Sequence, residues 1–403
     1  MDYITNKRTL YNHNFIVFLF ILTVFYPFKG LLNIGFYTFI NDSDPFLFNK
    51  FCFAILFLFI IATTFITGIP ADKNNRLHIF MSAIVCPITI YYLDFELYGV
   101  VIQLFILPLL LQVFDDISVN TFNKYVAAFF ILTLLYMSFE WILLQIRVDG
   151  ELLILKNQYF KYIKIISSGD NIIDGRSSTG GLLRSGGYLA NPLAMPVLVT
   201  MAAFYFYLSY KIYNKYLFCA LIGSFIVVST SSTTAIIAYT LSILIIEIYY
   251  RKNFFLKAIA GTIIVVFLLP YHPSFNSIIL RVENNFSNQS YVNTFFDFHN
   301  LLSLSALKAF LIGEWKWSTI HISSHIDLLL IVNSLGIIFS SYIFYRIFFR
   351  GIIYHAKHRN IYSIYSLLLL PAFISLYHMD MTLNINVMII VVLLSNRVRK
   401  KVI

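Results

Sequence analysis

Apolar segments of about 20 residues recur along this chain, and they limit what it can fold into. A helix of this length crosses the roughly 30 Å hydrocarbon core of a bilayer. Charged residues make up only 12% of the sequence and hydrophobic residues 59%, whereas a soluble domain carries about 25% charged residues. The sequence therefore predicts an all-α, polytopic integral membrane protein.

We expect about twelve membrane-spanning helices within a single transmembrane domain, residues 1–403. The expected spans are residues 15–36, 46–69, 77–92, 97–114, 125–146, 188–210, 216–228, 233–249, 256–269, 326–349, 361–377 and 383–395. The first apolar run follows Lys7 and Arg8 and lacks a small-x-small cleavage site. It is therefore expected to be a retained helix rather than a signal peptide.

The positions of lysine and arginine predict an orientation. Cytoplasmic loops of membrane proteins are enriched in these residues, and most of them fall on one side if both termini are cytoplasmic. The opposite turns, residues 42–44, 94–96, 229–232 and 378–381, contain neither lysine nor arginine. Orientation thus explains most of the formal net charge of +10, and we expect no nucleic acid partner.

Two long external loops, residues 147–187 and 271–325, depart from this charge rule. Apart from Lys29 and Lys50, near the ends of the first two spans, they hold all the remaining basic residues: Arg147, Lys156, Lys161, Lys164, Arg176, Arg184, Arg281, Lys308 and Lys316. Positive charge on this side suggests an anionic ligand. Residues 301–312 in the second loop are amphipathic. They are expected to form a helix that lies on the membrane face or packs on other loops.

The end of the first loop combines the features of an anion site. Residues 184–196 read RSGGYLANPLAMP, and glycines such as Gly186 and Gly187 let backbone N–H groups approach an anion. A helix expected to begin near Tyr188 would add its positive N-terminal end. The alternative is that Arg184 extends to lipid headgroups from a helix end.

Two further groups are candidates for chemistry. His325 and Asp327 precede the tenth expected span, and a histidine can act as a general base on a sugar hydroxyl; a purely structural histidine is the alternative. The hydroxyl-rich turn at residues 229–234 could bind sugar or phosphate. Its alternative role, to satisfy backbone groups where two helices break, is favoured.

Several function classes lack their motifs. The sequence has no Walker loop, His-Glu-x-x-His helix or Cys-x-x-Cys pair, so no metal or other cofactor is expected. Carboxylates do not form a run deep in the spans, and Glu140 and Glu247 are expected near helix ends. An ion-coupled transporter is therefore weakly supported.

The layout of twelve spans with two large loops resembles bacterial O-antigen polymerases of the Wzy type and the related O-antigen ligases. Residues 184–196 are similar to the family's Arg-x-x-Gly before a proline-containing helix start, which carries Arg184 and Gly187. Arg281, within SIILRVENN, is similar to an arginine found early in the family's second loop. Related proteins often have Ser-Arg at the turn that spans residues 229–234 here, where this chain has no arginine.

The spacing of His325 and Gly336 is similar to the ligase-type pattern, although Ile326 replaces the usual polar residue. The resemblance implies metal-independent, inverting transfer of a glycan from undecaprenyl diphosphate. In that scheme Arg184 and Arg281 hold the diphosphate and His325 activates the acceptor hydroxyl. Candidate substrate-binding residues are Arg176, Gly186, Gly187, Lys308 and Asp327.

The resemblance also implies the setting of this reaction. We expect the bacterial inner membrane, with the active site facing the periplasm, and lipid-linked oligosaccharide, membrane lipid and a chain-length regulator as partners. An O-antigen ligase, which transfers the glycan to lipid A-core, is the nearest alternative. A polysaccharide flippase is the alternative from another class, and it would place cationic residues around a central cavity.

Overall fold

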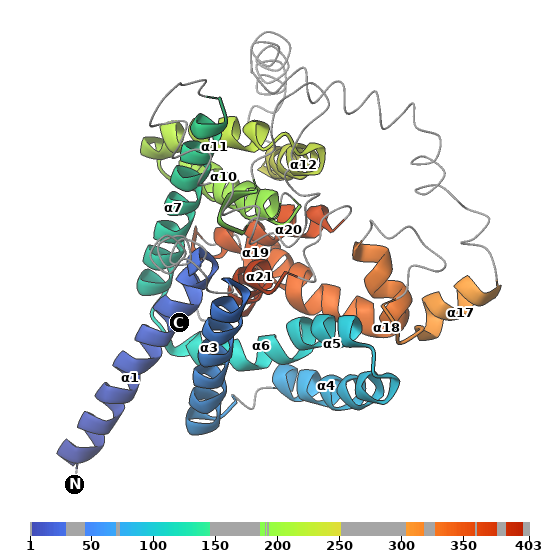
Figure 1. Cartoon of the computed structure of the whole chain (residues 1–403). Coiled ribbons are helices and arrows are strands. Elements are labelled where there is room, and N and C mark those ends of the chain that lie inside the picture. The colour runs from blue at the N-terminus through green and yellow to red at the C-terminus, as the bar shows by residue number, and fades with distance from the viewer. Residues whose placement is uncertain are drawn as a thin grey trace.

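The computed structural model describes residues 2–29, 45–69, 73–145, 186–189, 191, 193–250, 304–317, 327–358, 361–376 and 384–397. All regular elements in these ranges are helical (Figure 1). The N-terminal half contains α1 (Asp2–Phe25), η1 (Tyr26–Phe28), α3 (Pro45–Thr67), α4 (Lys73–Tyr92), α5 (Phe95–Val101), η2 (Ile102–Ile106), α6 (Leu107–Leu110), η3 (Leu111–Asp116) and α7 (Val119–Gln145).

The C-terminal half is helical as well. It contains η4 (Gly187–Leu189), α10 (Met195–Ile212), η5 (Asn214–Tyr216), α11 (Leu217–Ser229), α12 (Thr233–Tyr250), α17 (Leu304–Ile312), α18 (Asp327–Phe344), η7 (Tyr345–Phe349), α19 (Arg350–His358), η8 (Ile361–Leu368), α20 (Leu369–Ser375) and α21 (Ile385–Arg397). The elements η2 and η7 are π-helical, and the other η elements are 3₁₀-helical.

Five segments of the described chain are long and apolar enough to cross a membrane: Phe95–Asp116, Val119–Leu143, Met195–Ile212, Thr233–Tyr250 and Asp327–His358. Shorter apolar helices are His13–Phe28, Phe51–Thr67, Asn214–Ser229, Ile364–Ser375 and Ile385–Arg397. They agree with the membrane class expected from the sequence. The expected span at residues 256–269 lies outside the described residues, so the count of twelve stays a prediction.

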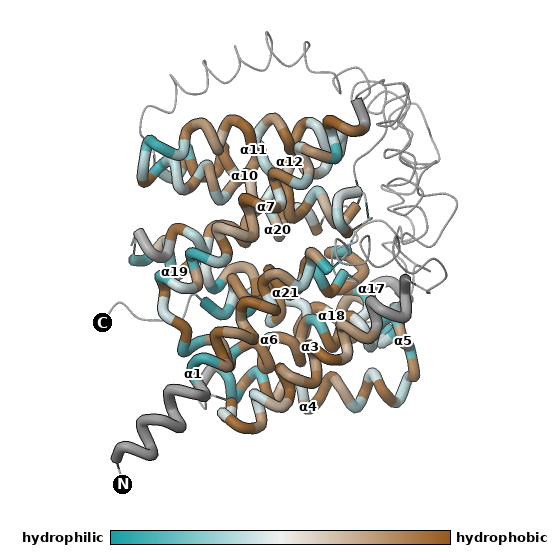
Figure 2. The backbone as a smooth tube through the Cα atoms, turned by 60° about the vertical axis from the view of Figure 1, so that its left-hand side comes forward, coloured by the Kyte–Doolittle hydropathy of each residue, from teal (hydrophilic) through white to brown (hydrophobic). Residues whose placement is uncertain are grey.

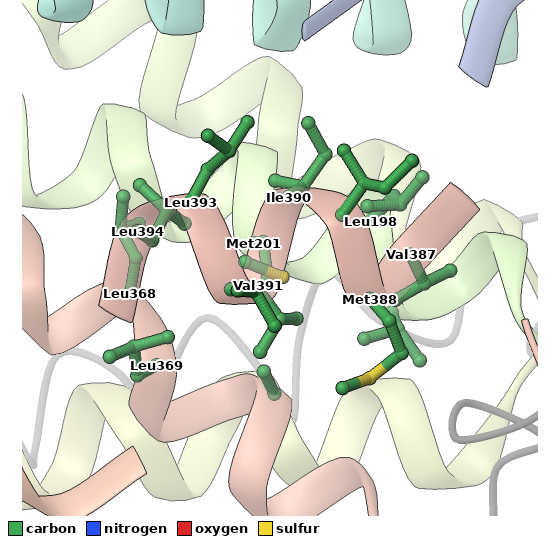
Figure 3. Close-up of a cluster of buried hydrophobic side chains, with 14 of the residues drawn as sticks. Leu198, Met201, Leu368, Leu369, Val387, Met388, Ile390, Val391, Leu393 and Leu394 are labelled. Atoms are coloured by element: carbon green, nitrogen blue, oxygen red, sulfur yellow. The ribbon is translucent and has the colours of Figure 1, made fainter. Parts of the chain in front are cut away.

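Helix α10 lies inside the bundle, in contact with α7, α11, α12, α20 and α21. All its residues from Met195 to Phe206 are buried. Figure 3 shows Leu198 and Met201 among side chains of η8, α20 and α21, including Leu368 and Val391. On another face, α11 approaches closely at Gly223, where an added Cβ would lie 2.9 Å from the Cα of Ala203. Small residues allow such close helix packing.

Polar contacts join several helix ends at one end of the bundle, which we name the basic end. Lys211 of α10 forms an ion pair with Glu247 of α12. Asn396 of α21 accepts a hydrogen bond from Arg346 at 3.4 Å, and Arg397 donates to the carbonyl of Ile117 before α7 at 2.8 Å. The charge pattern assigns all these segments to one side of the membrane, and the structure brings them together.

The opposite end is named the loop end. Four of its residues lie next to or within the two expected external loops: Gln145, Gly186, Trp317 and Asp327. The other two, Leu376 and Asn384, lie at the end of α20 and just before α21. Figure 2 shows α5 and α17 at this end and α19 at the other. Asp94 joins two segments here, because its carboxylate accepts the N–H of Leu97 at 2.9 Å and that of Trp317 at 3.0 Å.

Helix α18 is broken at Gly336, whose φ of 77° and ψ of 163° are not helical. Gly313, after α17, packs its backbone against this break. A Cβ on Gly336 would lie 2.6 Å from the carbonyl carbon of Ile312, and one on Gly313 would lie 2.7 Å from that of Leu335. Glycine is therefore required on both sides of the contact, which we name the Gly313–Gly336 lock.

The break in α18 leaves several carbonyl groups without their usual hydrogen-bond donors inside the helix. Groups at and near the lock supply these donors instead. The N–H groups of Glu314 and Trp315 donate to the carbonyls of Asn333 and Ser334, each at 2.9 Å. The Ser340 hydroxyl donates to the carbonyl of Ile331 at 3.1 Å. Broken helices persist at membrane depth only where neighbouring groups satisfy the backbone in this way.

The amphipathic segment expected at residues 301–312 forms helix α17, which packs on α18. It buries Ala309, whereas Leu311 and Ile312 are exposed. Lys308 is exposed as well. The helix therefore packs on a bundle helix and presents an apolar surface outward; most of the loop residues on which it might also pack lie outside the described residues.

Replacing Gly336 with alanine is expected to destabilise the protein more than replacing Gly68, which also has a positive φ, 75°. A side chain in left-handed backbone costs about 1–2 kcal/mol at either position. At Gly336 alone the new Cβ also overlaps backbone, which adds about 1–3 kcal/mol; no atom lies within 4 Å at Gly68. Unfolding of both full-length variants in one detergent measures the difference, and equal losses would contradict the lock.

Candidate functional site

Half of the residues predicted for the site fall inside the described ranges. Gly186, Gly187, Lys308 and Asp327 are described, whereas Arg176, Arg184, Arg281 and His325 lie outside the described residues. The candidate site is therefore built from the segments that directly follow two of these residues. Gly186 stands two positions after Arg184, and Asp327 two positions after His325.

The backbone amide of Gly186 donates a hydrogen bond to the carboxylate Oε1 of Glu140 on α7, at 3.3 Å. The Glu140 side chain is fully buried. The sequence predicted that this amide would face an anionic ligand, but in the structure it faces a protein carboxylate. Glu140 thus attaches the segment after Arg184 to the helical bundle.

Gly187 has a φ of 58°, in the region that favours glycine. A Cβ there would lie 2.5 Å from Cγ of Met195 and 2.8 Å from Sδ of Met137. Close packing between α7 and the start of α10 therefore accounts for the glycine. Tyr188 follows, buried, with its ring 4.1 Å from that of Phe28 and its hydroxyl 3.1 Å from that of Thr133.

The expectation that a helix begins near Tyr188 is wrong, because α10 begins at Met195. Residues 187–189 form the short η4 turn. The Asn191 side chain then accepts the N–H groups of Leu193 at 2.8 Å and Ala194 at 3.0 Å. Asparagine commonly satisfies N–H groups at a helix start in this way. The positive end of the helix dipole therefore lies about two turns later than expected.

Asp327 is the first residue of α18 and is buried. An acidic residue in the first turn is favoured by the helix dipole. The N–H of the next residue, Leu328, donates to the carbonyl of Leu376 at the end of α20, at 3.1 Å. The start of α18 is thus fixed to the end of α20.

The course of η8 and α20 relates Asp327 to Gly186. Tyr365 of η8 stacks on Tyr205 of α10, with ring centroids 5.0 Å apart, and its hydroxyl lies 3.3 Å from that of Ser209. From this contact near the end of α10, α20 runs antiparallel to α10 toward its start. Since Gly186 precedes α10 and the start of α18 is bound to the end of α20, Gly186 and Asp327 lie at the same end of the bundle, the loop end.

The hydroxyl-rich turn at residues 229–234 satisfies its own backbone. Ser229 donates to the carbonyl of Phe225 at 2.9 Å, and Thr230 to that of Val227 at 2.7 Å. The hydroxyl oxygens of Thr230 and Ser232 accept the N–H groups of Ser232 and Ala235. The favoured sequence interpretation of this turn, as a structural break between two helices, is confirmed.

The sequence interpretation missed the role of Glu140. It placed this residue near a helix end, which is correct for α7, but it did not connect the carboxylate with the glycines 46 positions later. An isolated carboxylate in an apolar segment is a signal of a specific partner, because burying it is costly. Only the structure identifies Gly186 as that partner.

No protein-family model, curated protein or solved structure matches this chain. Its likeness to the polymerases and ligases consequently rests on the motifs and layout of its own sequence. Any assignment of function depends on how far the described residues suit that chemistry.

Replacing Glu140 with leucine removes the acceptor of the Gly186 amide. A hydrogen bond to a charged group contributes about 1.5–3 kcal/mol, so amide exchange at Gly186 is expected to accelerate about tenfold or more. Glu140→Gln keeps an oxygen acceptor without the charge, so its exchange rate should lie between those of the parent and Glu140→Leu. Native-state hydrogen exchange of the full-length protein, followed by mass spectrometry of peptides covering residues 186–189, measures this.

The matched control is Glu96→Leu, which removes an exposed carboxylate in the first turn of α5. It should leave exchange at Gly186 unchanged. Parent-like exchange in Glu140→Leu would show that Glu140 does not hold this segment.

Proposed function

We propose that this protein is a polymerase of O-antigen or a related bacterial surface polysaccharide. It transfers a growing glycan from undecaprenyl diphosphate to a sugar hydroxyl on another lipid-linked repeat unit. The observation that supports the proposal is that Gly186 and Asp327, which follow Arg184 and His325 by two residues, lie at one end of the bundle: Gly186 precedes α10, and the start of α18 is bound to the end of α20, which packs on α10. A reaction that uses residues from both loops requires the segments at Gly186 and Asp327 to lie on the same side of the membrane.

In the proposed reaction the acceptor hydroxyl oxygen attacks the anomeric carbon of the donor sugar. The bond from that carbon to the phosphate oxygen breaks, and the diphosphate leaves with the electron pair. His325 takes the hydroxyl proton as a general base. Arg184 and Arg281 bind the diphosphate and stabilise its developing negative charge. Attack from the face opposite the leaving group inverts the anomeric configuration.

The described candidate residues have supporting roles in this proposal. Gly187 and Glu140 hold the segment after Arg184 against α7 and α10. Lys308 is exposed on α17 at the loop end and can attract an anionic substrate. Arg176 is proposed to act with Arg184. Asp327 is separated from His325 by two positions, so their side chains would point apart on a regular helix.

The proposal places the protein in the bacterial inner membrane with both termini in the cytoplasm. The basic end then faces the cytoplasm, as the positive-inside rule requires, and the loop end faces the periplasm. Lipid-linked oligosaccharides are the substrates, and a chain-length regulator is a further proposed partner.

An O-antigen ligase is the second candidate, favoured by the ligase-type spacing of His325 and Gly336. In the structure Gly336 occupies backbone that suits glycine alone, at the Gly313–Gly336 lock. The backbone conformation thus accounts for a glycine at position 336 whether the protein is a ligase or a polymerase. The two candidates differ in the acceptor, so the products distinguish them.

Cells that lack the gene should accumulate single lipid-linked repeat units if the protein is a polymerase. A ligase would instead leave full-length polymer attached to the lipid carrier. Gel analysis of the lipid-linked and the surface glycan pools measures this. Normal polymer in both pools would contradict the polymerase proposal and the ligase alternative together.

Complementation with variants tests the residues. Arg184→Ala and His325→Ala should each reduce elongation about 100-fold or more, the usual contribution of such groups. Arg184→Lys should restore it only partly if the guanidinium binds phosphate through two hydrogen bonds. The control Lys215→Ala removes an exposed cation at the basic end and should have no effect. Full activity in the first two variants, at normal protein level, would eliminate this site.

A further inference from the structure

Two polar side chains directly before the break in α18 are buried without hydrogen bonds. Asn333 is 1% exposed and Ser334 is fully buried. Their carbonyl groups are bound at the Gly313–Gly336 lock, but their side chains are not. Among the residues that the structure describes, neither polar atom of the Asn333 amide group has a hydrogen-bond partner, and the Ser334 hydroxyl has none. Most buried polar side chains in proteins do have partners, so this pair requires an explanation.

Another buried asparagine, Asn396 of α21, shows the usual arrangement. It is 2% exposed. Its amide oxygen accepts a hydrogen bond from Arg346 at 3.4 Å, and its nitrogen donates to the carbonyl of Pro108 at 3.0 Å. A buried donor or acceptor without a partner costs more free energy than an apolar group of the same shape. Asn333 therefore lowers the stability of the fold unless a ligand completes its hydrogen bonds.

The segment that lies against Asn333 and Ser334, residues 313–317, has a strained backbone. Trp315 has a φ of 57°, which is rare for a bulky residue. Such strain occurs mainly at ligand-binding and active sites. The amide of Glu314 binds the Asn333 carbonyl, and Glu314 is partly exposed. The buried pair thus lies directly beneath a strained segment that borders the surface.

This pair is also close to the loop end. Asn333 follows Asp327 by six positions, which corresponds to about 9 Å along a helix. The strained segment reaches the loop end as well, because the amide of Trp317 is bound to Asp94. A ligand that arrives at the loop end therefore has only a short distance to cover.

The chemistry of the two side chains indicates the class of ligand. An asparagine amide group donates through nitrogen and accepts through oxygen, and a serine hydroxyl does both. Phosphate oxygens only accept, so a phosphate would leave the Asn333 oxygen unpaired. A metal cation would leave its nitrogen unpaired. The hydroxyl and acetamido groups of sugars both donate and accept, as water does, and they match this pair.

We propose that Asn333 and Ser334 bind hydroxyl or acetamido groups in the glycan of a lipid-linked repeat unit. This inference rests on the proposed function, which brings such glycans to the loop end. Entry requires residues 313–317 to move aside, since they lie between the pair and the surface. An ordered water molecule that only completes the hydrogen bonds is the competing explanation.

The test compares two ligands of the full-length protein in phosphatidylcholine nanodiscs: lipid-linked repeat units purified from cells that lack the gene, and undecaprenyl diphosphate without a glycan. Asn333→Leu should raise the Kd of the repeat unit about tenfold, the effect of losing hydrogen bonds to the ligand. It should leave the Kd of undecaprenyl diphosphate unchanged. Its melting temperature should rise, because the substitution removes an unpaired buried amide.

The matched control is Asn396→Leu, which removes a buried asparagine whose amide group is fully partnered at the basic end. It should lower the melting temperature and leave both Kd values unchanged. If Asn333→Leu does not fold, Ser334→Ala replaces it in the test, since it removes only one unpaired hydroxyl. An unchanged Kd of the repeat unit in Ser334→Ala would then overturn the inference.

The outcomes separate this inference from the proposed function. Parent-like binding of the repeat unit by Asn333→Leu overturns the sugar site and leaves the proposed function intact. A lower melting temperature together with parent-like binding identifies water as the partner of Asn333. Equal weakening of both ligands shows an effect on the whole fold and also overturns the inference. If cells that lack the gene accumulate no lipid-linked repeat units, the proposed function and this inference both fail.

Discussion

Placing a backbone carbonyl or amide in hydrocarbon without a hydrogen-bond partner costs several kcal/mol of free energy. At the break in α18, this constraint is met because the carbonyl groups find other donors. Two amides after α17 and one hydroxyl of α18 bind the freed carbonyls of Ile331, Asn333 and Ser334. The amides reach these carbonyls because Gly313 and Gly336 allow the two backbones to touch. The position of α17, and of the chain that follows it, depends on this contact.

The same constraint determines how the loop end is built. Asp94 binds the amide of Trp317, Glu140 binds that of Gly186, and the carbonyl of Leu376 binds that of Leu328. Each contact fixes a segment adjoining a long loop to a helix of the bundle. The described segments that follow Arg184 and His325, the residues proposed to act from these loops, therefore rest on fixed supports. Such supports are needed to hold catalytic groups within fractions of an ångström.

The sequence predicted the helical class from the length of its apolar segments. It also predicted which helix ends lie on the same side, from the positions of lysine and arginine. Both signals can be read directly along the chain. It placed the start of α10 too early, since neither the left-handed Gly187 nor the side-chain contacts of Asn191 can be read from periodicity. Gly336 within an apolar run gave no sign of a break. The partnership of Glu140 with Gly186 joins segments distant in sequence, so only the structure revealed it. Arg176, Arg184, Arg281 and His325 remain predictions.

The enclosure of α10 has a consequence for biosynthesis. Its residues from Met195 to Phe206 are covered on all sides, and part of that cover comes from α20 and α21, which the ribosome makes much later. Chains fold from the N-terminus as they emerge, so one face of α10 must wait in lipid, or against an insertion chaperone, until synthesis is nearly complete. Truncated chains that lack α20 and α21 should then be recognised by membrane quality-control proteases.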